Sequence, residues 1–194
     1  MRMGDFKMRI GLDVDNVILD FDGGMLDAML LEDKNKRNKG IINENANYIL
    51  SGMFDWSNSE IVAFMDENTE RIACTLRPLE GAKYYMDKLL EEGHELILIS
   101  NRAYPHYKEP FLTTATTLKN NQINYTKLVI TETNDKSSAC LQNKVDILVD
   151  DRATNCYLAM KNNIKCCLMK SRYEKRSFTD LDSVSNWEEL YYKI

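Results

Sequence analysis

Acidic side chains follow two short apolar segments of this sequence, at the point where each segment ends. Asp13 and Asp15 stand directly after the first segment, and Asp150 and Asp151 stand directly after the second. Carboxylates in such places are poor core residues, and in an open parallel sheet the carboxyl ends of the strands form the crevice where ligands bind. Asp also starts ordinary turns, so the first pair alone leaves a purely structural role open.

A hydroxyl, an amide and an ammonium group are predicted at the same edge of the sheet. Ser100 and Asn101 follow a strongly apolar segment, and Lys136 lies at the start of the predicted helix that precedes Asp150. Crowded carboxylates repel one another unless a cation lies among them. Oxygen ligands without thiolate or imidazole favour Mg²⁺, which keeps waters and a substrate phosphate in its shell. The ligands are expected among the four acids Asp13, Asp15, Asp150 and Asp151.

This set of groups is suited to phosphoryl transfer. A carboxylate that attacks phosphorus forms an aspartyl-phosphate, which splits one difficult displacement into two easier ones. Lys136 adds a second cation, and the Ser100 hydroxyl can donate to a phosphoryl oxygen. Asp15 is placed to protonate the leaving oxygen and then to deprotonate the attacking water. Helix capping explains any one of these acids, but not why acids, hydroxyl and lysine all fall at strand ends.

Apolar segments alternate with helical patterns along most of the chain, and this alternation predicts an α/β fold. Strands and helices of these lengths indicate a Rossmann-like parallel sheet, built from right-handed βαβ units with helices on both faces. Strands are predicted at residues 8–12, 95–100, 127–131, 145–149 and 164–169. Helices are predicted at residues 25–31, 82–92, 111–121, 137–142, 153–161 and 186–190.

The stretch between the first two predicted strands differs in character. It is polar and rich in Asn, and its apolar residues follow a helical period. One helical face is expected at Ile42, Ala46, Ile49 and Leu50. A second helix is expected around residues 61–65. We therefore predict a core domain of residues 1–21 and 77–194, with residues 22–76 inserted as a small helical cap.

Substrate choice is expected to come from this cap, because the acids and Lys136 contact only the phosphoryl group. Phe21, Phe54 and Trp56 are candidates for stacking on a nucleobase or for enclosing an apolar leaving group. The alternative for Phe54 and Trp56 is that they form the small core of the cap itself. Arg102 either binds a second anionic group of the substrate or faces solvent.

Composition argues against several classes of protein. With 25 basic and 30 acidic side chains, the chain has a net charge of −5 and little electrostatic attraction for a nucleic-acid polymer. No run approaches the ~18 apolar residues of a membrane span, and the first apolar run is too short for a signal peptide. Five cysteines without CxxC spacing indicate reduced, mostly buried thiols in a cytoplasmic protein. Two histidines give little support to a zinc site or a Ser-His-Asp triad.

The order of these motifs resembles that of the haloacid dehalogenase superfamily of phosphohydrolases, over nearly the whole chain. The motifs that carry the resemblance are Asp13-x-Asp15, Ser100, Lys136 and Asp150-Asp151. Within the superfamily, the chain resembles the 5′(3′)-deoxyribonucleotidase group, also called cytosolic type C nucleotidases. The features shared with that group are the run from Asp13 to Phe21, the compact helical insertion after it, and the Asn186-Trp187-Glu188-Glu189 ending.

The resemblance implies a role for each motif residue. Asp13 would be the nucleophile and a Mg²⁺ ligand, and Asp15 the general acid and base, giving its main-chain oxygen to the metal. Ser100 and Lys136 would hold the phosphate. One or both of Asp150 and Asp151 would complete the metal shell.

The sequence departs from the superfamily pattern at two places. Asn16 stands where the superfamily usually has Gly, and Asn tolerates the left-handed backbone that such a turn needs. Asn101-Arg102 follows Ser100, where the nucleotidases differ, and this difference bears on the substrate more than on the chemistry.

The hypothesis is a Mg²⁺-dependent phosphomonoesterase whose partner is a small phosphate ester, with a nucleoside monophosphate as the first candidate. A phosphatase for sugar phosphates or other metabolite phosphates is an alternative, as is a non-catalytic protein that binds a phosphorylated ligand. A dehalogenase of this fold would need neither Mg²⁺ nor the second acid, so Asp15 and the pair Asp150-Asp151 argue against it. The oligomeric state is open, with a homodimer among the alternatives.

Overall fold

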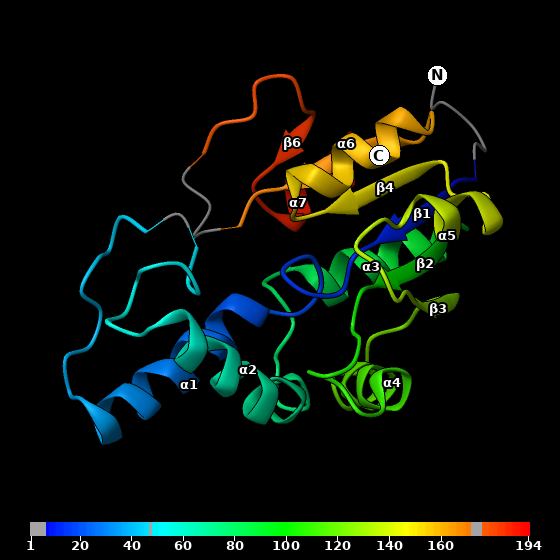
Figure 1. The fold of residues 1–194 in the computed structure, drawn as a ribbon. Coiled ribbons are helices and arrows are strands. Elements are labelled where there is room, and N and C mark those ends of the chain that lie inside the picture. Colours follow the sequence, from blue (N-terminus) through cyan, green and yellow to red (C-terminus); the bar gives the residue numbers. More distant parts are fainter. Residues whose placement is uncertain (1–6, 47, 172–175) are drawn as a thin grey trace.

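A parallel sheet forms the centre of the structure, a computed structural model that describes residues 7–46, 48–171 and 176–194 (Figure 1). Within these ranges the sheet has six strands, in the order β3-β2-β1-β4-β5-β6, and every neighbouring pair is parallel. The strands are β1 (Arg9–Leu12), β2 (Glu95–Ser100), β3 (Lys127–Ile130), β4 (Ile147–Asp150), β5 (Lys165–Met169) and β6 (Ser183–Val184). The predicted α/β fold with a parallel sheet is confirmed.

Strand β1 occupies the middle of the sheet and determines where the site lies. Ile10 of β1 is in register with Leu96 of β2 on one side and with Ile147 of β4 on the other. The chain leaves β1 first toward β2 and β3, and later returns to β4 and β5 on the opposite side. The strand order therefore reverses between β1 and β4, and a ligand crevice is expected outside the carboxyl ends of these strands.

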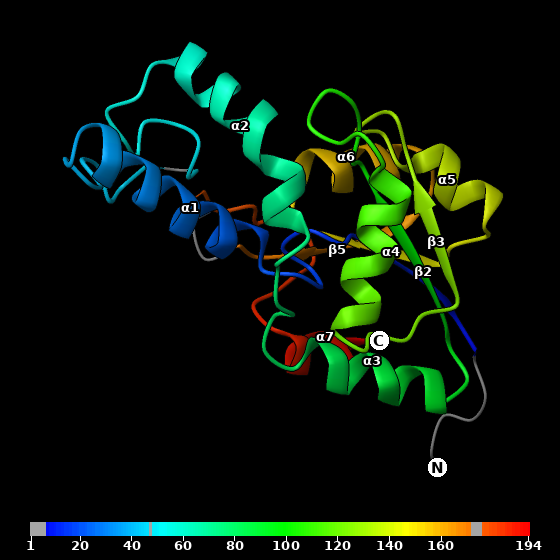
Figure 2. The same cartoon turned by 90° about the horizontal axis from the view of Figure 1, so that it is seen from below.

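Helices cover both faces of the sheet, as the alternation predicts (Figure 2). The core helices are α3 (Ala82–Glu91), α4 (Pro110–Asn120), α5 (Ser137–Gln142), α6 (Ala153–Lys161) and α7 (Trp187–Lys193). Buried side chains of α3, α4 and α7 join one apolar cluster, whereas those of α5 and α6 join a second. Adjacent Cys167 and Cys166 of β5 belong to the first and second cluster respectively, because successive side chains of a strand point to opposite faces. All five cysteines are free thiols and four are buried, as predicted.

The core elements lie close to their predicted positions. Strand β2 and helices α5 and α6 have the predicted bounds, and the other predicted core elements begin and end within three residues of them. The closing helix α7 buries Trp187, whose indole nitrogen donates to the Val17 carbonyl at 2.7 Å. The short strand β6 was not predicted. In the part of the chain that the structure describes, no helix is both long and apolar enough to cross a membrane.

Two cap helices, α1 (Phe21–Lys36) and α2 (Asn58–Ala73), follow β1 and lie to one side of the sheet (Figure 1). Helix α1 is longer than predicted, since Asp20 caps it by accepting from the Gly23 amide at 3.0 Å. A capping box of Ser57 and Glu60 starts α2. The cap helices predicted after the first strand are therefore present.

The helical face predicted at residues 42–50 is wrong. Residues 38–46 and 48–57, as described, contain turns and bends and no helix. Asn38, Gly40 and Gly52 have positive φ values of 53°, 67° and 77°, and the Asn45 amide donates to the Asn43 side chain at 3.0 Å. Such local side-chain hydrogen bonds and left-handed residues compete with helix formation. Ala46 and Ile49 of the predicted face are still buried, at 5 % and 1 % exposed, whereas Ile42 is 56 % exposed.

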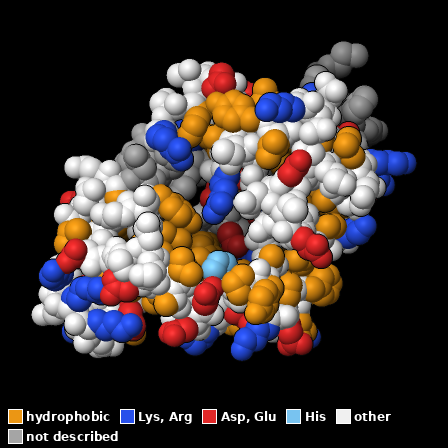
Figure 3. Space-filling model, in the orientation of Figure 1, with side chains coloured by type: hydrophobic (Ala, Val, Ile, Leu, Met, Phe, Trp, Pro, Cys, Tyr) orange, Lys and Arg blue, Asp and Glu red, His pale blue; other side chains and the backbone are white. Residues whose placement is uncertain are grey.

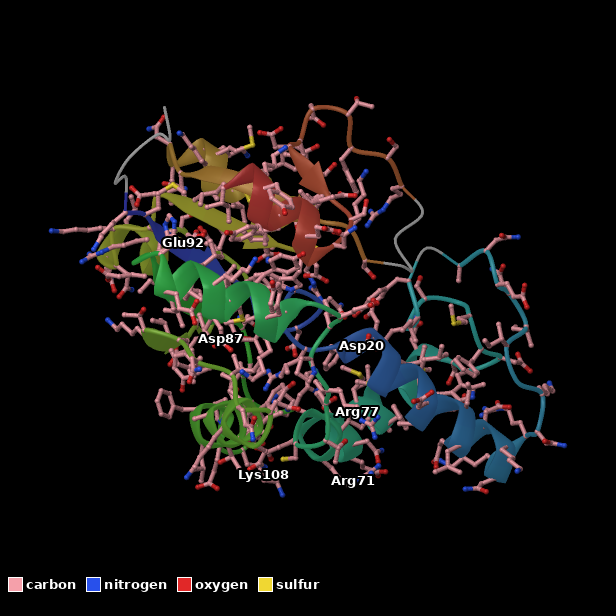
Figure 4. All side chains as sticks on the ribbon, turned by 180° about the vertical axis from the view of Figure 1, so that it is seen from behind. Asp20, Arg71, Arg77, Asp87, Glu92 and Lys108 are labelled. Carbon is pink, nitrogen blue, oxygen red and sulfur yellow. The ribbon has the colours of Figure 1, made fainter. Side chains whose placement is uncertain are left out.

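The chain crosses between core and cap before α1 and again after α2. The segments before α1 and after α2 are hydrogen-bonded to each other, because the Asp20 amide donates to the Arg77 carbonyl at 2.9 Å. Both residues are labelled in Figure 4. The predicted division into residues 1–21 with 77–194 and residues 22–76 stays a prediction.

Helix α2 of the cap is hydrogen-bonded to α4 of the core. Glu70 accepts from the Glu109 amide at 3.0 Å and from the Thr113 hydroxyl at 2.9 Å, both at the start of α4. Further along, the Thr117 hydroxyl donates to the Ala73 carbonyl at 3.0 Å. These contacts make one side of the cap continuous with the core.

Candidate active site

Three carboxylates meet at the carboxyl ends of β1 and β4. One oxygen each of Asp13, Asp150 and Asp151 lies within 4.8 Å of the other two. The ends of the strands are held together here, since the Asp13 amide donates to the Val149 carbonyl at 2.9 Å. The group, here called the acid cluster, can hold a metal ion, and its oxygen donors fit a hard cation such as Mg²⁺.

Lys136 lies against the acid cluster and is 2 % exposed. Its ammonium is 2.7 Å from Asp13 Oδ2 and 2.8 Å from Asp150 Oδ2. Burial alone would lower the pKa of Lys136, but the carboxylates of Asp13 and Asp150 outweigh it and raise the pKa above the ordinary lysine value. Lys136 is therefore a fixed cation beside the predicted nucleophile.

Burial makes the carboxyl groups of the acid cluster weaker acids. It raises the pKa of Asp13 to about 6, against the pull of Lys136 and with a further upward contribution from Asp150. Burial and the neighbouring Asp150 also raise the pKa of Asp151 well above the ordinary value. A cation placed among these groups would favour their ionised forms.

Asp150 and Asp151 have different surroundings. Both oxygens of Asp150 accept from Asn155 at 3.0 and 3.1 Å, and Oδ2 also accepts from Lys136, so its carboxylate is largely occupied. Asp151 lines the cavity and accepts from the Asn16 side chain at 3.0 Å. This difference favours Asp151 as a direct metal ligand and Asp150 as the partner that fixes Lys136.

A cavity of about 340 Å³ opens over the acid cluster, between the cap and the core. Figure 3 shows a hollow at this junction, with acidic and basic side chains inside it. The predicted site residues that line it are Asp13, Asp15, Phe21, Ser100, Asn101, Lys136 and Asp151. The structure therefore brings most of the predicted set together around one space.

Ser100 has an unused hydroxyl in this cavity. The residue is 1 % exposed, and its Oγ has no hydrogen-bond partner among the described residues. An unpaired buried hydroxyl is costly in a folded protein, so a ligand oxygen is its natural partner. The adjacent Asn101 amide makes one long contact, 3.4 Å, to the Thr131 carbonyl.

The two predicted aromatic contacts differ in position. Phe21, the first residue of α1, lines the cavity. Trp56 does not line it: its indole nitrogen donates to buried Asp33 at 3.0 Å, and its ring packs between Phe54 and Phe64 with centroids 5.7 and 5.3 Å away. The alternative in which Phe54 and Trp56 form the core of the cap agrees with these contacts.

Arg102 is 0 % exposed, so the alternative in which it faces solvent is wrong. Its guanidinium pairs with Asp15 through Nε, 3.0 Å from Oδ2, and through a second nitrogen close to Oδ1. A third nitrogen donates to the Thr114 hydroxyl at 3.1 Å. These partners leave Arg102 poorly placed to bind a second anionic group of the substrate.

Several residues of the site were not predicted from the sequence. Asn155, Tyr48 and Tyr107 line the cavity, and the Tyr107 hydroxyl is buried without a hydrogen-bond partner among the described residues. Asn155 lies in the first turn of the helix after Asp150, and that position is a usable signal. The two tyrosines lie in loops, where no periodic pattern indicates their direction.

Asn16 has the left-handed backbone expected of it, with φ of 59°. Its side chain also links two parts of the site, because it donates to Asp151 and accepts from the Asp22 amide at 2.9 Å. A glycine at this position would keep the backbone and lose both contacts.

The raised pKa of Asp13 predicts how the stability of the metal-free protein changes with pH. A folded-state pKa of about 6, above the ordinary value of 3.8 for Asp, means that the folded state favours the protonated carboxyl. The contribution of Asp13 to the free energy of unfolding is therefore full below about pH 4 and lost as the pH rises to about 6. Thermal unfolding in EDTA at a series of pH values, compared with Asp13→Asn, measures it.

The same comparison in excess Mg²⁺ provides the control, since metal ligands must be deprotonated to bind. We expect the wild type to gain stability from Mg²⁺ above about pH 6 and little below it. The same difference between wild type and Asp13→Asn at every pH in EDTA would contradict the assignment.

Comparison with known proteins agrees with this geometry. The model of the family described as 5′ nucleotidase, deoxy (pyrimidine), cytosolic type C protein matches residues 7–194. The chain belongs to this nucleotidase family. It is accordingly a hydrolase, and the family implies a phosphate ester as substrate. A search among curated protein sequences finds no match.

Solved structures with the same fold come from the haloacid dehalogenase superfamily. A haloacid dehalogenase-like hydrolase, SP0104 from Streptococcus pneumoniae, superimposes with a TM-score of 0.65 at 13% identity, over 97% of this chain and 99% of that one. The hydrolase YfnB from Bacillus subtilis, solved with magnesium bound, gives 0.64 at 17% identity, over 96% and 98% of the two chains. The L-2-haloacid dehalogenase PA0810 gives 0.58 at 13% identity, over 96% and 99%. At these identities the likeness establishes the fold.

Proposed function

We propose that this nucleotidase-family protein is a Mg²⁺-dependent phosphomonoesterase that hydrolyses nucleoside monophosphates through an aspartyl-phosphate on Asp13. The observation that carries the proposal is the position of the Asp13 carboxylate. It belongs to the acid cluster, lies 2.7 Å from the buried ammonium of Lys136, and lines the same cavity as the unpaired Ser100 hydroxyl. The family supports the nucleotide substrate.

The metal would be held by the side chains of Asp13 and Asp151 and by the main-chain oxygen of Asp15. When bound, Mg²⁺ neutralises part of the charge on the phosphoryl oxygens. Ser100 donates its hydroxyl hydrogen to a phosphoryl oxygen, and Lys136 supplies a second positive charge. Asn101 is proposed as a further donor to the phosphate.

The reaction has two displacements at phosphorus. A carboxylate oxygen of Asp13 attacks, the bond from phosphorus to the ester oxygen breaks, and that oxygen takes a proton from Asp15 and leaves as the nucleoside hydroxyl. Water then attacks the phosphorus of the aspartyl-phosphate and gives a proton to Asp15. The bond to Asp13 breaks, and inorganic phosphate and the original carboxylate result.

The leaving group lies on the cap side of the cavity in this proposal. Phe21 and the tyrosines of the cavity wall offer flat apolar surfaces of the kind that nucleobases stack on. Trp56 has no such position, since it lies inside the cap. Cytoplasmic location, a homodimer and the absence of a nucleic-acid partner stay predictions.

A substrate panel tests the proposal. Phosphate release is measured with Mg²⁺ on deoxy- and ribonucleoside monophosphates, and on sugar phosphates as the competing class. We expect kcat/KM for the best nucleotide to exceed that of every sugar phosphate by at least about 10-fold, the discrimination that one well-fitted apolar pocket provides.

The other outcomes decide between the alternatives. Higher kcat/KM on sugar phosphates than on nucleotides would show that the substrate is a sugar phosphate. The proposed mechanism would be unaffected. Ligand-induced thermal stabilisation without phosphate release from any ester would indicate a binding protein instead. The second acid, Asp15, argues against that last outcome, because a binding protein needs no proton donor.

A further inference from the structure

Arg102 and Asp15 form a two-point ion pair beside the acid cluster. Nε and a terminal nitrogen of the guanidinium each donate to a different oxygen of Asp15. The Arg102 side chain is 0 % exposed, whereas that of Asp15 is 21 % exposed and reaches the cavity. The two parallel N–H donors of a guanidinium fix the direction of the carboxylate that accepts from them. The ammonium group of a lysine would not fix it in this way.

The guanidinium is itself held from two sides. Its third nitrogen donates to the Thr114 hydroxyl of α4 at 3.1 Å, and its central carbon lies 5.3 Å from the centre of the Tyr107 ring. Burying a charge this completely is costly unless its partners are well aligned. Arg102 therefore has one orientation, and that orientation is aimed at Asp15.

We propose that Arg102 is a positioning residue, which fixes the carboxylate of Asp15 for proton transfer in the second displacement of the reaction. The proposal rests on the proposed function. In the second displacement Asp15 acts as an acceptor, so the direction of its carboxylate oxygens determines whether the proton of the attacking water has an acceptor within reach. In that step the water oxygen bonds to phosphorus, the bond to the Asp13 oxygen breaks, and the proton goes to Asp15.

The structure also predicts what Arg102 does not do. It lies behind Asp15 and its nitrogens are occupied by Asp15 and Thr114, so it acts through Asp15 and not on the phosphate. Its removal should therefore matter only while Asp15 is present. A purely structural role would lower activity regardless of the residue at position 15.

A double-mutant cycle separates these roles. We measure kcat with Mg²⁺ for the wild type, Arg102→Met, Asp15→Asn and the double variant. Arg102→Met is expected to lower kcat by about 10²-fold, the typical effect of a misplaced catalytic group. In the Asp15→Asn background the same change is expected to cost less than about 3-fold, because coupled residues are not additive. Equal losses in both backgrounds would overturn the proposal.

A second readout identifies the step. In Arg102→Met the aspartyl-phosphate is expected to accumulate, so acid-quenched enzyme retains more phosphate label than the wild type during turnover. Arg102→Lys keeps the charge without the fork and should lie between the two. A labelled fraction equal to or below that of the wild type would also overturn the proposal.

If Arg102→Met fails to fold, Thr114→Val takes its place in the double-mutant cycle. It removes one hydrogen bond of the guanidinium and keeps the side-chain volume at position 114. It is expected to lower kcat by about 3- to 10-fold, an effect that should disappear in the Asp15→Asn background. Additive losses would count against the proposal here too. Full activity of Asp13→Asn would instead refute the proposed function, so the two failures are distinguishable.

Discussion

Asp13→Asn is expected to lower the rate of phosphate release by at least about 10⁴-fold, because the amide cannot replace the carboxylate as nucleophile. The fold should survive the change. Asp13 is buried and its pKa is raised, so a neutral side chain of the same shape removes an unfavourable charge from the cluster. Phosphate release from an aryl phosphate and from the best nucleotide measures the effect, with thermal unfolding as the check on folding.

Asp55→Asn is the matched control. Asp55 is an exposed cap residue whose ion-pair partner is Lys39, outside the cavity. Its variant should retain the wild-type rate within about 2-fold, as expected for a surface change. Equal turnover by wild type and Asp13→Asn would remove the aspartyl-phosphate from the mechanism.

Lys136→Met is expected to have the largest effect on stability. It leaves the carboxylates of Asp13 and Asp150 buried without their common cation, and breaking such a buried pair costs about 3–5 kcal/mol. Activity should fall by about 10²- to 10³-fold, because a charge that stabilises the transferring phosphoryl group is lost. Urea unfolding in EDTA measures the first effect, and kcat/KM with Mg²⁺ the second.

Lys193→Met provides the comparison, since Lys193 pairs with Asp182 at 3.0 Å on the surface. Breaking that exposed pair should change the free energy of unfolding by less than about 1 kcal/mol. Mg²⁺ should restore part of the stability that Lys136→Met loses, because it places another cation among the carboxylates. A loss for Lys136→Met no larger than that for Lys193→Met would show that its buried pairs contribute little.

Local patterns predicted the core and most of the site because strands end where apolar runs end. Asp13, Ser100 and Asp150 each stand at the end of a run or directly after it, and the parallel order of the strands brings those ends together. Two rules, alternation of elements and ligand binding at strand ends, are enough for that step. Neither requires knowledge of side-chain contacts.

Tertiary contacts explain what the patterns missed. Residues 42–50 have a helical period, but Ala46 and Ile49 are buried there without a helix, since asparagine turns and left-handed glycines set the backbone. Arg102 follows a strand end, where an exposed charge is the ordinary expectation, and only its approach to Asp15 and Thr114 shows why it is buried. Such pairings join residues far apart in the chain and have no local signature.

The cap has two parts whose sequences can change to different extents, because hydrogen bonds join its helices to the core. Glu70 ties α2 to the start of α4, and α4 carries Thr114, which is one hydrogen bond from Arg102 and two from Asp15. Hydrogen bonds and the first turn of α4 therefore link α2 to Asp15. Helix α1 is connected to the metal side of the site, because the Asp22 amide donates to Asn16 and Asn16 donates to Asp151. Changes of leaving group are therefore expected to arise in the loop between the two cap helices more readily than in the helices themselves.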